Sequence, residues 1–213
     1  MVRKILEKVP DELLQQDLER YVQMALQLGA ADAIIITANM VVIDERVRAK
    51  CIVPLCTSYG KSANCPPYAM ELDLVRGVVG KFRYAIFSKL EVPAEEIAGP
   101  EAREKRSAIP YTRKNSEIVA EIEAEAFRDG YYLTMGFASG SCRSIFCYET
   151  DCNALMAGQP CRFPLKARTS MEAVGMDVYA MATKVGWDIY PIGRTTPPQQ
   201  VPFGVMCGLV LVY

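Results

Sequence analysis

The grouping of the cysteines constrains this chain more than any other feature of its sequence. Seven of the eight cysteines fall in two short segments. The first segment, residues 51–67, contains Cys51, Cys56 and Cys65. The second segment, residues 139–164, contains Cys142, Cys147, Cys152 and Cys161. Clustered thiolates are soft ligands that select zinc, copper(I) or iron–sulfur clusters. The fold is therefore expected to present two metal-binding cysteine loops.

Length and charge narrow the class of protein. A chain of 213 residues, of which 51% are hydrophobic, can bury a core without covalent cross-links. The formal net charge of −1 offers no electrostatic footprint for nucleic acid and no polybasic membrane patch. No apolar run approaches the ~18 residues of a membrane span. We therefore expect a partner neither in nucleic acid nor in the membrane, and nothing in the sequence indicates the oligomeric state.

The expected compartment decides how the cysteines are interpreted. The first ten residues contain Glu7 and lack the apolar stretch of a signal peptide, so a cytoplasmic protein is expected. In a reducing cytosol, grouped cysteines bind metal or do chemistry more often than they form disulfides. The chain contains no histidine, which excludes Ser-His and Cys-His catalysis and His-ligated zinc or haem. A zinc site here would use cysteine alone, or cysteine completed by Asp or Glu.

Hydrophobic periodicity predicts an α/β fold in a single domain, residues 1–213. An amphipathic helix is expected at 11–28, within the N-terminal segment 1–29, and others at 68–81 and 114–129. A capping-box pattern at 169–172 predicts a helix running to Val185. Strands are expected at 83–90, 131–137 and 205–213, with two strands within 30–43. The sum is a mixed sheet of four to six strands flanked by helices, with both cysteine-rich loops at one end.

Cysteine spacing favours an iron–sulfur cluster over zinc. The gaps in the second segment are four, four and eight residues, whereas structural zinc prefers two close cysteine pairs. A [4Fe–4S] cluster is commonly held by three thiolates from one loop and a fourth from further along the chain. Cys142, Cys147 and Cys152 would supply the loop, and Cys161 the fourth ligand. Arg143 and Arg162 are candidates to offset cluster charge, or else are solvated surface.

The first segment supplies three thiolates, so its completion is left open. If Cys207 folds back as a fourth ligand, the chain has two complete sets of four, which suits electron relay. If Cys207 is a core residue, as its apolar neighbours Met206 and Leu209 suggest, one iron position lacks a cysteine ligand. Substrate could then bind at that position, which would act as a Lewis acid. Tyr59, Lys61 and Ser62 are candidate helpers for such an enzyme.

Several motifs resemble a known family. They are Cys51 to Cys56, Cys65-Pro66-Pro67, Pro160-Cys161-Arg162-Phe163-Pro164 and residues 167–178. Together they resemble a prokaryotic family of predicted metal-binding proteins, domain of unknown function 2284, over nearly the whole chain from about residue 30. The central cysteines of that family are more tightly spaced, and its position corresponding to Phe163 is commonly histidine. The resemblance implies metal binding in an anaerobic, redox setting and supplies no defined reaction.

Three functions follow from these observations. The first is an iron–sulfur redox protein with one or two [4Fe–4S] clusters, an electron carrier or a small reductase component. Since the sequence has no glycine-rich nucleotide loop, its electrons would come from a redox partner protein. The second is an enzyme with a three-cysteine cluster that binds substrate. The third is an interaction protein stabilised by a four-cysteine zinc site.

Overall fold

The computed structural model describes residues 2–156, 158–193 and 195–213. Its sheet has four strands in the order β1-β2-β4-β3. Their bounds are β1 Asp32–Thr37, β2 Tyr84–Pro93, β3 Met135–Phe137 and β4 Phe203–Leu211. All three strand pairs are antiparallel. The α/β prediction is confirmed, and its strand count holds at the lower end of four to six. The expected mixture of strand directions is wrong, because every neighbour runs antiparallel.

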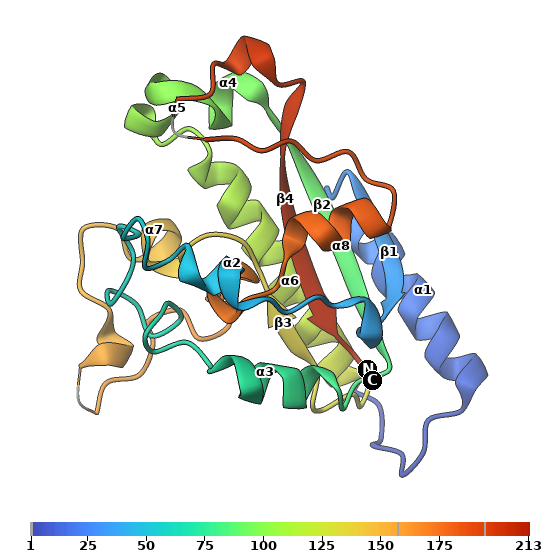
Figure 1. Cartoon of the computed structure of the whole chain (residues 1–213). Helices are drawn as coiled ribbons and strands as arrows, with labels where there is room; N and C mark the ends of the chain where they lie inside the picture. The colour runs from blue at the N-terminus through green and yellow to red at the C-terminus, as the bar shows by residue number, and fades with distance from the viewer. Residues whose placement is uncertain (1, 157, 194) are drawn as a thin grey trace.

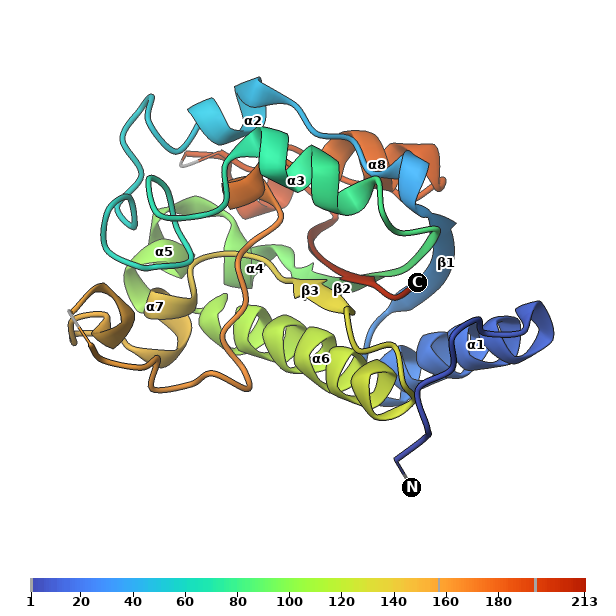
Figure 2. The ribbon, with the colours of Figure 1, turned by 90° about the horizontal axis from the view of Figure 1, so that it is seen from below.

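Helices cover both faces of the sheet, which gives three layers (Figures 1 and 2). The α-helices are α1 Asp11–Gln27, α2 Glu45–Ala49, α3 Leu72–Val79, α4 Ala94–Ile97, α5 Gly99–Lys105, α6 Ile109–Arg128, α7 Cys142–Phe146 and α8 Val178–Lys184. Short 3-10 turns are η1 Ala38–Met40, η2 Asn153–Leu155, η3 Glu172–Val174 and η4 Pro198–Gln200. Figure 2 shows α1 and α6 on one face of the sheet and α2, α3 and α8 on the other.

The two long helices form because each carries one apolar stripe. The stripe of α1 consists of Leu14, Leu18, Tyr21 and Ala25, all buried. The stripe of α6 includes Ile118 and Ile122, and both stripes join the core that contains Ile86 and Val210 of the central strands. The opposite face of the sheet packs Phe87 and Leu209 against Met171 and Met181. The helices predicted at 11–28 and 114–129 are thereby confirmed, as are the strands at 83–90 and 205–213.

The second strand predicted within 30–43 is wrong among the described residues. After β1 and η1, the backbone of Val42 accepts a hydrogen bond from Asp177 N at 2.8 Å. The next residue, Ile43, forms an isolated bridge with Met176. The apolar β-branched residues therefore pair with a loop near α8 rather than returning along β1.

The helix predicted from the capping box at 169–172 to Val185 is interrupted. Gly175 has φ of +76°, a left-handed conformation that ends η3 after one turn. The Asp177 side chain then accepts a hydrogen bond from Ala180 N at 2.9 Å and starts α8. A glycine followed two residues later by aspartate was the sequence signal for this break. In the described part of the chain, no helix has the length and apolar character that a membrane crossing requires.

Candidate metal centre

The first cysteine loop runs between α2 and α3, and side-chain hydrogen bonds join the segments at its two ends. Arg48, at the end of α2, is buried and donates to Met70 O at 2.8 Å and to Glu71 Oε1 at 3.0 Å. Within the loop, Cys56 N donates to Cys51 O at 3.0 Å, and Gly60 N donates to Pro66 O at 2.8 Å. These backbone hydrogen bonds close two turns within residues 51–67, the segment that carries the three cysteines.

The second cysteine loop begins between β3 and α7, and the first residue of α7 is Cys142. Two arginines from the α5–α6 region bind the carbonyls of this short helix. Arg106 donates to Ser144 O at 2.7 Å, and Arg113 donates to Ile145 O at 2.8 Å. Because a short helix leaves its last carbonyls unpaired, these arginines fix α7 in place.

The end of the second loop, at Arg162 and Phe163, contacts its earlier part at Phe146 and Asp151. Arg162 donates to Asp151 O at 2.5 Å. The Phe163 ring packs on the Phe146 ring with centroids 5.5 Å apart. Phe163 thus stands where the resemblance expects histidine and contributes an aromatic contact instead of a metal ligand. Of the two arginines predicted to offset cluster charge, Arg162 is engaged in bracing the loop.

The two loops meet through their cysteines. Ser62 Oγ lies 3.2 Å from Cys142 Sγ, and Asn64 Nδ2 donates to the same sulfur at 3.4 Å. In the other direction, Cys65 Sγ donates to Ser141 Oγ at 3.4 Å. Both loops lie on the same side of the molecule in both views (Figures 1 and 2). The thiols of Cys65 and Cys142 are therefore buried where the loops adjoin.

These contacts also show what sequence reasoning missed. Asn64 and Ser141 were not predicted as site residues, although each lies next to a cysteine in the sequence. Thr169 supports the arrangement from a third segment, because its hydroxyl donates to Asn64 Oδ1 at 3.0 Å. Ser62 was predicted as a helper for substrate, whereas it is fully buried against Cys142.

Burial makes the central thiols poor acids. The pKa of the Cys65 thiol is raised to about 11, chiefly by burial and in smaller part by the neighbouring Cys142, Cys56 and Cys51, against the opposing hydrogen bond with Ser141. Burial likewise raises the pKa of Cys142, opposed by Ser62 and Asn64 and reinforced by Cys152 and Cys161. A charge on the Cys142 thiol of the second loop thus raises the pKa of Cys65 in the first loop. A bound cation would favour the thiolate forms, because a coordinating thiol is deprotonated.

All eight cysteines are free thiols in the structure. Within residues 2–156, 158–193 and 195–213, no group of three or more Cys, Asp or Glu side chains is arranged to hold a metal ion. The structure therefore brings the two loops together without closing their thiols around one point. The cysteine thiols are soft donors of the kind that bind a thiophilic metal. That they come together around one metal centre stays a prediction.

Cys207 lies apart from the loops. It sits in the middle of β4, opposite Lys89, and is 2% exposed within the hydrophobic core that also contains Phe87. Burial raises the pKa of its thiol, and the nearby Glu172 adds to that rise. This environment is that of a core residue.

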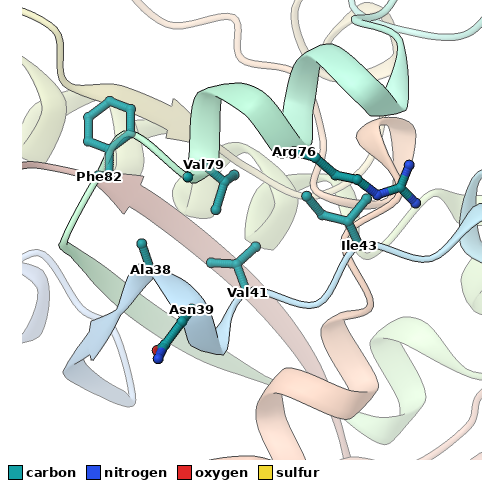
Figure 3. Close-up of a pocket in the computed structure, with 8 residues that line it drawn as sticks. Ala38, Asn39, Val41, Ile43, Arg76, Val79 and Phe82 are labelled. Carbon is teal, nitrogen blue, oxygen red and sulfur yellow. The ribbon is translucent and has the colours of Figure 1, made fainter.

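Two hollows of similar size differ in their relation to the cysteines. One, of about 410 Å³, lies between η1 and α3 away from the loops, and Figure 3 shows its largely apolar walls. Its lining consists of Ala38, Asn39, Val41, Ile43, Arg76, Val79, Gly80 and Phe82. The arginine is already paired with Glu45 and Asp73. The other hollow, of about 420 Å³, lies between the two cysteine loops and includes Cys152.

The chain belongs to a family described as predicted metal-binding protein (DUF2284), whose profile matches residues 34–212. That match includes both cysteine loops and leaves α1 outside. No curated protein and no solved structure matches this chain. Family membership supports metal binding and agrees with the cysteine-rich sequence.

Proposed function

We propose that this protein binds iron–sulfur clusters through its two cysteine loops and serves in electron transfer or as a small reductase component. The observation that carries the proposal is the meeting of the loops at Cys65 and Cys142, supported by Ser62, Asn64 and Ser141. Seven soft donors on adjoining loops suit iron–sulfur ligation. The spread spacing of the cysteines favours iron–sulfur over a four-cysteine zinc site.

Residues around the sulfurs have a defined part in this proposal. A bound cluster would supply reversible one-electron chemistry. Hydrogen bonds to ligand sulfurs and exclusion of water tune the potential of such a centre. Ser62 and Asn64, both directed at Cys142 Sγ, are the groups that would supply those hydrogen bonds. Arg143, with no described carboxylate partner, would offset negative charge.

Electrons would arrive from a redox partner protein. Support comes from the start of the first loop, where Ile52, Val53 and Leu55 are 50%, 70% and 64% exposed. These apolar side chains lie between Cys51 and Cys56 in the sequence. Exposed apolar side chains grouped beside a candidate centre are typical of a contact surface.

A substrate-binding cluster is the second candidate function. The burial of Cys207 in the core leaves seven loop cysteines, which divide into one set of four and one set of three. A three-cysteine set leaves one iron position for a ligand other than cysteine. Both candidates share the same metal and differ in the number of cysteine ligands.

Metal and sulfide analysis of anaerobically prepared protein tests the proposal. Wild-type protein is expected to contain iron and acid-labile sulfide in equal amounts and to lose visible absorption with dithionite. The variant C161A is expected to lose iron, whereas the matched core variant C207A is expected to retain it. Stoichiometric zinc without sulfide would support the zinc-stabilised interaction protein instead and would refute the iron–sulfur proposal.

A further inference from the structure

The hollow between the cysteine loops has the size of a small-molecule site. Its volume of about 420 Å³ falls within the ~300–1,000 Å³ range of ligand pockets. Gly60 and Lys61 of the first loop form one side, and Arg143, Asp151 and Cys152 of the second loop form the other. The hollow therefore exists only because the two loops adjoin.

Its cations are available to a ligand. Neither the Lys61 ammonium nor the Arg143 guanidinium pairs with a carboxylate among the described residues, although many arginines of this chain do. Arg106, Arg113 and Arg162, which lie around the same loop, are already bound to backbone carbonyls. Arg143 is half-buried, which strengthens its attraction for an anion relative to a fully solvated group.

The remaining lining restricts what can bind. Asp151 contributes one carboxylate, so the three charged groups sum to one positive charge. Leu155 and Met156 add apolar surface. This combination suits a small organic molecule that carries an oxyanion for the two cations.

We propose that the hollow between the two cysteine loops binds a small organic oxyanion, a carboxylate or phosphate ester, through Lys61 and Arg143. Arginine suits both groups because its planar fork matches their two oxygens. Cys152 in the wall places that ligand beside the centre proposed above, and this part of the inference rests on the proposed function. The binding site itself depends on the two cations and on the meeting of the loops.

Calorimetric titration of the anaerobically prepared whole chain tests this proposal, with succinate and inorganic phosphate as separate probes. At least one probe is expected to bind saturably, and the stronger of the two identifies the oxyanion class. K61A and R143A are each expected to weaken that binding about tenfold, the loss of one charge-assisted contact. D151N is expected to tighten it about two- to threefold, because a repelling charge is removed.

Lys184, an exposed lysine of α8, provides the matched control, and K184A is expected to bind as wild type does. Lys61 is itself exposed, so K61A tests the pocket without disturbing a buried contact. Absence of saturable binding of both probes, or equal affinities of wild type, K61A and R143A, would overturn the inference. Iron and sulfide are measured on the same samples. Zinc-loaded protein that binds the probe through Lys61 and Arg143 would uphold the pocket while refuting the iron–sulfur proposal.

Discussion

Replacing Asn115 of α6 should destabilise the junction between the sheet and the second cysteine loop. Its side chain is buried, and its Nδ2 donates to Cys207 O and to Ser139 Oγ, both at 2.9 Å. In N115A two hydrogen bonds are lost, each worth about 1 kcal/mol, and the two acceptors, Ser139 Oγ and Cys207 O, lose this partner in a buried site. The buried Asn115 Oδ1 has no hydrogen-bond partner among the described atoms. Because N115A also removes this unpaired acceptor, the loss of stability is partly offset. The expected net cost is about 2–3 kcal/mol.

Urea unfolding of the whole chain measures this cost, with exposed Glu121 on the same helix as the control. E121A is expected to change the free energy of unfolding by less than about 0.5 kcal/mol. N115D should cost more than N115A at neutral pH, because a carboxylate would face the Cys207 carbonyl in a dry site. Burial would raise the folded-state pKa of that carboxyl, so its deficit should shrink as pH falls. A cost below about 0.5 kcal/mol for N115A would refute the assigned role of Asn115.

Two further predictions concern buried positions elsewhere in the fold. Burial alone would raise the pKa of Asp17, but hydrogen bonds from Arg3 and Tyr131 outweigh it and lower that pKa. D17N removes the carboxylate that pairs with Arg3 and should cost about 3 kcal/mol at neutral pH. Because the folded-state pKa of Asp17 is lowered, the stabilisation from its ionised form should also decline as pH falls below the ordinary aspartate value of 3.8, as urea titrations at several pH values would reveal. Gly208→Ala would place a Cβ 2.5 Å from Val119 Cγ2 and should lower the free energy of unfolding by about 1–3 kcal/mol; an unchanged thermal midpoint would contradict this packing.

Elements with strong periodicity were predictable from the sequence. The buried stripe of α1 indicates which face that helix hides, and the continuous apolar run of β2 indicates a strand buried on both faces, so the positions of both elements follow from the pattern of hydrophobic residues. The pairing of residues 41–43 could not be predicted, because a β-branched run does not specify its partner. Here the partner is the loop that begins at Gly175, whose left-handed backbone is a local feature that hydrophobic periodicity does not report.

The site was predictable in its residue types and only partly in its geometry. Cysteine grouping indicated two loops, and the structure adds that Cys65 and Cys142 lie where those loops meet. The roles of the two arginines were not separable by sequence, because both flank cysteines. The structure distinguishes them, since Arg162 binds Asp151 O whereas Arg143 lines the hollow.

X-ray absorption at the iron and zinc edges of anaerobically prepared whole chain tests the central claim most directly. Cysteine ligation of iron–sulfur clusters predicts iron surrounded predominantly by sulfur, with further iron atoms in the next shell. Zinc surrounded by four sulfurs, or iron surrounded by oxygen and nitrogen with no neighbouring iron, would contradict the account.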